Sequence, residues 1–176
     1  MSTPLSFVAF PLSPSVPVND SLNFEPESPL GLDLDPLFER HARDMQAETP
    51  PESIHMLPRQ ALDRPEIAFF VLRDAGRPVG MAALKQLGQR RAEVKSMHVL
   101  TEARGAGLSR LMLTRLVAHA RQTGMVRLFL ETGVQPGFAA ARRLYRRGGF
   151  VECPPFGSYR ADPNSVFMTL ELRAEE

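Results

Sequence analysis

Apolar residues recur with two different periods along this chain, and the two periods predict alternating strands and helices. Apolar runs or alternating patterns typical of strands lie at 22–25, 67–72, 79–87, 92–99, 127–131, 150–153 and 166–172. Helical spacing and start signals predict helices from residue 35 to the prolines at 50–51, and at 59–62, 108–123 and 138–147. The order mixes hairpin-linked strands with two crossovers through helices. We therefore expect an α+β (mixed α/β) domain.

The best-defined helix begins at Leu108. Its apolar residues form one row at helical spacing, made of Leu108, Met112, Leu116 and Ala120. Gly124 is well placed to end this helix, because glycine readily adopts the left-handed conformation found after a last helical turn. For the helix that starts near residue 35, we expect Asp35 to be the cap and Pro36 the first helical residue.

The strand at 92–99 departs from simple alternation. Its apolar positions are Ala92, Val94, Met97 and Val99, so the period of two slips between residues 94 and 97. One extra residue in a strand is the sequence trace of a β-bulge, a feature often found beside active sites. The same slip also fits a strand that is covered on both faces of its sheet.

Composition limits the function classes. The 176 residues are 43% hydrophobic and 23% charged, which is typical of a globular domain. Lys plus Arg total 21 and Asp plus Glu total 20, so the overall charge does not favour nucleic acid. No apolar run is long enough to cross a bilayer. Cys153 is the single cysteine, so an internal disulfide is excluded, and this fits a protein of the reducing cytoplasm. We expect Cys153 to be a small buried side chain rather than a nucleophile.

The first 30 residues differ from the rest of the chain. Prolines interrupt their apolar stretches, and no Lys or Arg appears before Arg40. A secretory signal needs a basic start and an unbroken apolar run, so this segment does not fit one. We expect residues 1–20 to be an irregular arm and residues 21–176 to be one domain.

The segment 104–109 carries the strongest chemical signal. Arg104, Gly105 and Gly107 form a short turn between a strand and the helix that begins at Leu108. Backbone N–H groups at a helix start lack partners and carry the positive end of the helix dipole, so they favour a phosphate. Glycines let a ligand approach the backbone closely. The spacing fits neither a P-loop nor a Rossmann fingerprint. The turn is therefore a candidate site for a diphosphate, and an ordinary structural turn before a helix is the alternative.

Several separated segments resemble one family. Arg104–Ser109 is similar to Arg/Gln-x-x-Gly-x-Gly/Ala, the acetyl-CoA motif of the GNAT superfamily of N-acetyltransferases, with Ser109 in place of the last small residue. Residues 139–150 resemble the superfamily ending "A…LY…GF". Further segments resemble a narrower group of small-molecule acetyltransferases: 50–55, 83–85, 93–97, 130–133, 155–159 and 162–168. The resemblance covers roughly residues 30–173.

The resemblance implies a GNAT fold and acetyl-CoA as the acyl donor. The expected fold is a twisted mixed sheet of about six to seven strands, with splayed central strands and about four helices. The coenzyme lies between the splayed strands, and its pantetheine pairs with the strand backbone at Met97, His98 and Val99. Its diphosphate lies on the turn formed by Arg104, Gly105, Ala106, Gly107, Leu108 and Ser109. Arg142, in a basic cluster with Arg143, Arg146 and Arg147, is a candidate for the 3′-phosphate; an ordinary solvated helix face is the alternative.

Tyr145 and Glu93 are the candidate catalytic residues. In the superfamily, the tyrosine of the "LY" pair usually protonates the departing thiolate, and a phenol has a suitable pKa for this step. Tyr145 is alternatively a half-buried anchor of the last strands. Glu93 lies on the strand that lines the splay and is a candidate base for the amine, directly or through water. An ion pair with Lys95 or a nearby arginine is the other interpretation of Glu93.

The acceptor-binding wall is expected mainly from loops. The resemblance assigns Glu52 and His55 to one wall, and we expect Glu131, Thr132, Phe156 and Tyr159 on the opposite wall. His55 is a candidate base or acceptor contact, and a surface or capping histidine is the alternative. Phe156 and Tyr159 are alternatively core residues. Lys95 and Ser96 are polar residues in a central strand, so they need partners or a ligand. No spacing of His or Cys suggests a metal site.

We therefore expect an acetyl-CoA-dependent N-acetyltransferase that acts on a small-molecule amine in a ternary complex. A protein or peptide acetyltransferase is the alternative within the same class. A coenzyme A-binding regulatory module without catalysis is the alternative from another class. The superfamily also makes a homodimer possible, whereas neither nucleic acid nor membrane is expected as a partner.

Overall fold

The computed structural model describes residues 21–172, and the expected arm at 1–20 lies outside the described residues. The strands are β1 (Leu22–Pro26), β2 (Ile67–Asp74), β3 (Arg77–Gly88), β4 (Arg91–Val99), β5 (Arg127–Gly133), β6 (Val151–Glu152) and β7 (Ser165–Glu171). The α-helices are α1 (Asp35–Glu48), α2 (Leu108–Gln122) and α3 (Ala139–Arg147). Short 3₁₀ turns are η1 (Leu32–Leu34), η2 (Pro51–Ser53), η3 (Arg59–Leu62), η4 (Thr101–Ala103) and η5 (Pro136–Phe138).

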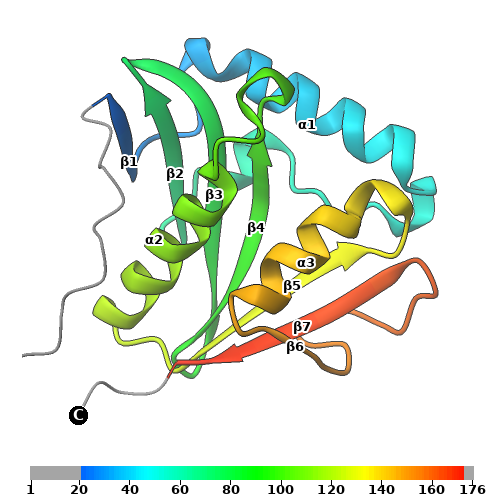
Figure 1. Ribbon diagram of the computed structural model, residues 1–176. Helices are drawn as coiled ribbons and strands as arrows, with labels where there is room; N and C mark the ends of the chain where they lie inside the picture. Colours follow the sequence, from blue (N-terminus) through cyan, green and yellow to red (C-terminus); the bar gives the residue numbers. More distant parts are fainter. Residues whose placement is uncertain (1–20, 173–176) are drawn as a thin grey trace, which may run out of the picture.

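The strands form one mixed sheet in the order β1-β2-β3-β4-β5-β7-β6 (Figure 1). All neighbours are antiparallel except β4 and β5, which run parallel and are connected through α2. The β2–β3 turn has positive φ at Ala75 and Gly76, and the β3–β4 turn has positive φ at Gln89 and Arg90. Two such residues match the twist of the flanking strands, which explains the tight hairpins. The α+β prediction is confirmed.

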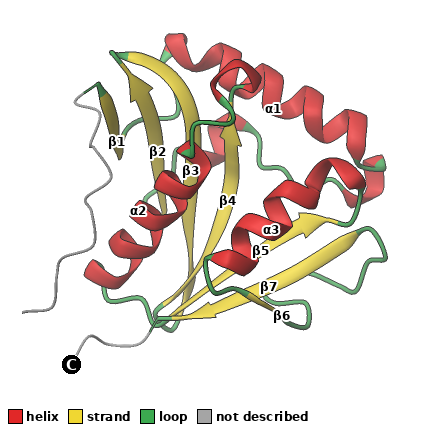
Figure 2. Ribbon diagram, in the orientation of Figure 1, coloured by secondary structure: helices red, strands yellow, loops and turns green. Residues whose placement is uncertain are grey.

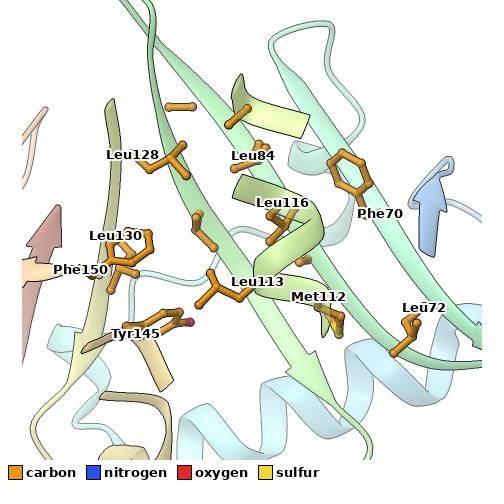
Figure 3. Close-up of a cluster of buried hydrophobic side chains, with 14 of the residues drawn as sticks. Phe70, Leu72, Leu84, Met112, Leu113, Leu116, Leu128, Leu130, Tyr145 and Phe150 are labelled. Carbon is orange, nitrogen blue, oxygen red and sulfur yellow. The ribbon is translucent and has the colours of Figure 1, made fainter. Parts of the chain in front are cut away.

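Helices cover both faces of the sheet (Figure 2). On one face, α2 and α3 cover a core in which the predicted row of α2 packs on β2 and β3; Figure 3 shows Met112 and Leu116 of this row beside Leu72 and Leu84. On the other face, Leu34 and Leu37 at the start of α1 pack on Val71, Met81 and Ala83. The sheet therefore has one hydrophobic core on each face, and β4 lies between the helices of the two faces.

The β-bulge predicted in β4 is confirmed. Lys95 lies opposite Ala83 and His98 lies opposite Met81, so β4 has one more residue than β3 between these pairs. Ser96 takes up the extra residue with φ of 52°. Because side chains alternate between faces, the bulge puts Lys95 and His98 on the α1 face and Met97 on the α2 face.

The expected splay of the central strands is confirmed as well. β4 pairs with β5 only from Arg91 to Val94, opposite Arg127 to Leu130. Both strands continue beyond this ladder, β4 to Val99 and β5 to Gly133. Their unpaired ends diverge in Figure 1. The sheet is therefore parted at its centre, between α1 on one face and α2 and α3 on the other.

Two local predictions differ from the structure. The expected second helix is only the 3₁₀ turn η3, so the described residues contain three α-helices and not four. Asp35 is the first residue of α1 and makes no capping hydrogen bond; Leu34 holds the cap position. The reason is that η1 runs directly into α1, and the carboxylate of Asp35 pairs with Arg59. Among the described residues, no helix is both long and apolar enough to span a membrane.

Candidate active site

A cavity of about 1330 Å³ lies where β4 and β5 part, and its lining comes from both faces of the sheet. The turn before α2, together with α2 and α3, supplies one part. The end of α1 and the loop that follows it supply another. Residues of β4 and β5 lie between these two parts. One cavity therefore connects the two faces through the gap in the sheet.

The turn before α2 has the properties of an anion site. Gly105 and Gly107 have φ of 88° and 76°, and a Cβ added at either position would meet no atom within 4 Å. Gly107 is the N-cap of α2, no side chain caps the helix, and its first turn holds no acidic residue. The first N–H groups of α2 are therefore available to a ligand, and Leu108 and Ser109 line the cavity.

The exposed side chain of Arg104 binds other groups of the protein. Its Nε donates to the carbonyl oxygen of Val99 at 3.0 Å, and its Nη2 donates to Oδ2 of Asp44 at 3.1 Å. A second ion pair joins Arg40 of α1 to Glu102 in η4. Helix α1 supplies the positive partner of one pair and the negative partner of the other. Together the two pairs attach α1 to η4 and to the glycine turn. Ala106, also assigned to the coenzyme, is exposed beside it.

The basic cluster of α3 divides into residues with different partners. Nη1 of Arg142 donates to the carbonyl oxygens of Gly133 at 2.6 Å and Gln135 at 3.1 Å. Arg146 pairs with Glu152 at 2.8 Å. Arg143 and Arg147 line the cavity. The arginine that we expected at a phosphate thus holds the loop after β5, and two of its neighbours face the cavity.

Tyr145 lies at the junction of the two halves. It is 8% exposed, it lines the cavity, and its hydroxyl donates to Sδ of Met97 at 3.7 Å. Figure 3 shows its ring at the edge of the core, near Phe150 and Leu130. Burial raises the pKa of Tyr145, and the nearby charge of Glu131 raises it further. The phenol is thus held in its protonated form, the form that can donate a proton.

Glu93 belongs to a buried hydrogen-bond network. Its Oε1 accepts from the hydroxyl of Tyr159 at 2.6 Å and from Nζ of Lys95 at 3.1 Å. Lys95 also donates to the hydroxyl of Tyr159 at 2.9 Å and to the carbonyl oxygen of His55 at 3.3 Å. The side chains of Glu93 and Lys95 are 4% and 9% exposed. These contacts leave Lys95 with all three of its donors in use.

Glu131 has a different environment on the same face. It lines the cavity, and its Oε1 accepts a hydrogen bond from Ser165 at 2.8 Å. Burial raises the pKa of Glu131; the hydrogen bond from Ser165 and the charges of His55 and Lys95 oppose this rise. Its second oxygen has no recorded donor among the described residues. Glu131 is therefore a carboxylate able to take a proton from a bound molecule.

The remaining predicted acceptor residues are distributed unevenly. His55, Ser96 and Thr132 line the cavity, and the ring of His55 meets that of Tyr159 edge-on at 5.0 Å. Phe156 is half-buried, packs on Phe129 and Phe167, and does not contribute to the lining. Glu52 is exposed and does not contribute to the lining.

Sequence reasoning missed the contribution of α1. His41, Asp44, Met45 and Glu48 line the cavity, and Thr49 follows them. Their spacing of three and four residues was a usable signal, because it puts them on one face of a helix. All of them except Met45 are polar, however, and a row of polar residues on a helix resembles an ordinary solvated face. Among residues 21–172, no group of three or more His, Cys, Asp or Glu is arranged to hold a metal.

Comparisons with known proteins agree on one family. Residues 34–150 match the Acetyltransferase (GNAT) family. The chain is 40% identical over 136 residues to "Uncharacterized N-acetyltransferase YsnE" of Bacillus subtilis, covering 77% of this chain and 90% of the relative. It is 41% identical over 147 residues to "IAA acetyltransferase" of Azospirillum brasilense, covering 83% and 95%. A proposed acyl-CoA N-acyltransferase of Klebsiella pneumoniae superposes with a TM-score of 0.72 at 27% identity, covering 88% of this chain and 100% of that one.

Proposed function

The chain belongs to the acetyltransferase (GNAT) family and is an acyltransferase; from this premise we propose that it transfers the acetyl group of acetyl-CoA to an amine of a small molecule, in one ternary complex. The single observation that carries the proposal is the cavity through the parted sheet. An anion-binding helix start lies on one face of the sheet, and carboxylates lie on the other. Donor and acceptor can therefore approach each other from opposite faces.

The donor half fits a coenzyme A thioester, which supplies the activated acetyl group when bound. The open glycines and the uncapped N–H groups of α2 would hold its diphosphate. The backbone of β4 from Met97 to Val99 pairs with β3 but not with β5, and its side facing β5 would hold the pantetheine. Arg143 and Arg147 are available to a phosphate beyond the turn, whereas Arg142 supports the loop that contributes Gly137 and Phe138 to the lining.

Proton transfers at the amine and at the thiolate complete the reaction. Glu131 would take one proton from the acceptor ammonium, because it lines the cavity and has an oxygen free to accept one. The neutral amine would then attack the thioester carbonyl, and Tyr145 would donate its proton to the departing thiolate; the second proton that the nitrogen loses would restore the Tyr145 hydroxyl, directly or through water. We give Glu93 the task of holding Lys95 and Tyr159, since both already donate to its Oε1. The free thiol of Cys153 is compatible with our proposal of a cytoplasmic enzyme.

The experiment combines acetyl-CoA binding by calorimetry with thiol release in the presence of small primary amines. We expect binding and turnover by the wild-type protein. We expect Tyr145→Phe to lower turnover by roughly 10²- to 10⁴-fold with an unchanged Kd for acetyl-CoA. Binding without turnover on any amine would favour a regulatory module. Faster acetylation of peptide N-termini than of small amines would favour the peptide alternative.

A further inference from the structure

The acceptor half of the cavity carries carboxylates at two separate elements. Glu131 is on β5, and Glu48 is the last residue of α1. Both line the cavity. Lys95, a cation on the same face, has its three donors bound to Glu93, Tyr159 and the carbonyl oxygen of His55. The ammonium of Lys95 is therefore not free to bind an anionic group of the acceptor, whereas a cationic group finds two carboxylates.

The end of α1 offers more than one acceptor of hydrogen bonds. A Cβ added at Gly137 would lie 2.6 Å from Cδ of Glu48, so this side chain lies directly over the loop between β5 and α3. The last turn of α1 contains no basic residue, and its final carbonyl groups carry the negative end of the helix dipole. This helix end is therefore suited to a positive charge.

Thr49 provides an independent observation at the same place. It is 6% exposed and lines the cavity, and its Oγ1 has no hydrogen-bond partner among the described residues. A buried hydroxyl without a partner is costly unless a ligand completes it. An ammonium group has three donors. Glu48, Thr49 and the terminal carbonyls of α1 would supply three acceptors for it.

Apolar side chains line the same cavity. Met45 of α1, Met56 of the following loop and Phe138 of η5 all contribute to its lining. Methionine adapts well to flexible aliphatic chains. An acceptor with an aliphatic chain would therefore find apolar contacts in addition to the two carboxylates.

We propose that the acceptor is an aliphatic di- or polyamine, acetylated on the amine at Glu131 while Glu48 and Thr49 bind its second cationic group. This inference rests on the proposed acetyl transfer and adds the class of acceptor. The reactive end loses its proton to Glu131, and the other end keeps its charge throughout the reaction.

The test uses acceptors that differ only at the second end. Cadaverine, pentylamine and 5-aminovalerate share one amine and one chain length, and their second ends are positive, neutral and negative. Thiol release from acetyl-CoA gives kcat/KM for each, and the shorter pair putrescine and butylamine tests the spacing. We expect cadaverine or putrescine to exceed its monoamine about fivefold or more, the scale of one favourable ion pair. We expect 5-aminovalerate to be the poorest acceptor.

Glu48→Gln and Thr49→Val should each reduce this preference for the diamine. The matched control is Glu39→Gln, which makes the same charge change on an exposed residue of α1 outside the lining. Thr49→Val should leave the Tm unchanged or raised, because Oγ1 has no partner to lose. Turnover with equal values for the three compounds, or a preference unaffected by both variants, would overturn the inference alone. Absence of acetyl-CoA binding and of all turnover would overturn the proposed function.

Discussion

Glu93 and Glu131 show how two carboxylates on one face acquire different chemistry. Two donors already occupy Oε1 of Glu93, and one of them is a buried ammonium. Glu131 has a single donor, Ser165, and faces the cavity. Both are polar residues in apolar strands, so the sequence presents them alike. The difference comes from Tyr159 and Ser165, which are more than 30 residues away from the carboxylates they bind.

Glu131→Gln should separate the catalytic role of this carboxyl from its cost to stability. Burial raises the pKa of Glu131, so the folded state favours the protonated carboxyl. The favourable contribution of the protonated Glu131 carboxyl to stability is fully present below the ordinary glutamate pKa. It is lost as the pH rises through the raised pKa of Glu131 in the folded state. The variant should therefore be more stable than wild type at pH 8 and similar to it near pH 4, while kcat/KM falls and loses its acidic limb. Thermal unfolding and pH–rate profiles measure these effects, and an unchanged profile would exclude Glu131 as the base.

Glu93→Gln should affect stability strongly. The change leaves the buried ammonium of Lys95 without its counter-charge, which typically costs about 3–5 kcal/mol of unfolding free energy. The double variant Glu93→Gln, Lys95→Met removes both charges and should recover most of this loss. Urea unfolding of the wild type, both single variants and the double variant measures the coupling. A single Glu93→Gln variant as stable as wild type would show that the pair is not a buried charge pair.

At the scale of elements, the sequence predicts what depends on local spacing. The row from Leu108 to Ala120 defines α2, and the slip between Val94 and Met97 reveals the bulge that Ser96 forms. Neither inference needs knowledge of distant residues. The glycine turn is likewise local, so the proposed donor half of the site can be inferred from the sequence.

The acceptor half was less accessible because its partners come from distant elements. Arg142 and Arg143 are adjacent and identical in type, yet one binds loop carbonyls and the other lines the cavity. The polar stripe of α1 is indistinguishable from a solvated face until its packing against β4 is known. Sequence spacing gives the face of a helix, but not what that face meets.

Gly107→Ala tests the turn before α2, with Gly76→Ala as its matched control. The two glycines have φ of 76° and 83°, and an added Cβ meets no atom within 4 Å at either position. Both changes should cost about 1–2 kcal/mol of unfolding free energy from the left-handed backbone alone. Only Gly107→Ala puts a methyl group in the space for a diphosphate, so it should weaken acetyl-CoA binding about tenfold or more. Equal Kd values for both variants would argue against the diphosphate at this turn.

At the scale of the whole molecule, α1 joins the two halves of the site. Its middle is attached to the donor turn by the pairs Arg40–Glu102 and Asp44–Arg104, and its end supplies Glu48 to the acceptor half. The rings of His41 and His98 meet between these attachments at 5.3 Å. The contact of α1 with β4 is thus built from ionisable groups.

This contact should make the fold sensitive to acid. Burial is the main cause that lowers the pKa of His98 to about 4; the charges of Arg104 and Arg40 lower it further, and Asp44 opposes them. His41 has a similarly lowered pKa of about 4. Because the folded state favours neutral histidine, stability is full above the ordinary pKa near 6.5 and is lost as the pH falls toward 4.

Urea unfolding between pH 7.5 and 4 should show this loss, at most roughly 3 kcal/mol for His98, since one pKa unit corresponds to about 1.4 kcal/mol. His98→Gln removes the titrating group and should flatten the dependence on pH. His119, whose pKa burial also lowers, lies against Phe70 away from this contact and provides the control variant His119→Gln. A profile for His98→Gln as steep as that of wild type would assign the acid sensitivity elsewhere.

The short ladder between β4 and β5 has a consequence for how such enzymes diversify. Because the strands pair only from Arg91 to Val94 and then part, the proposed cradle for the donor and the proposed pocket for the second reactant are built by different segments. Mutations at the end of α1 or in the loop at 134–138 leave the glycine turn untouched. New substrate preferences can therefore evolve, or be selected from libraries confined to these two segments, without rebuilding the machinery that handles the thioester.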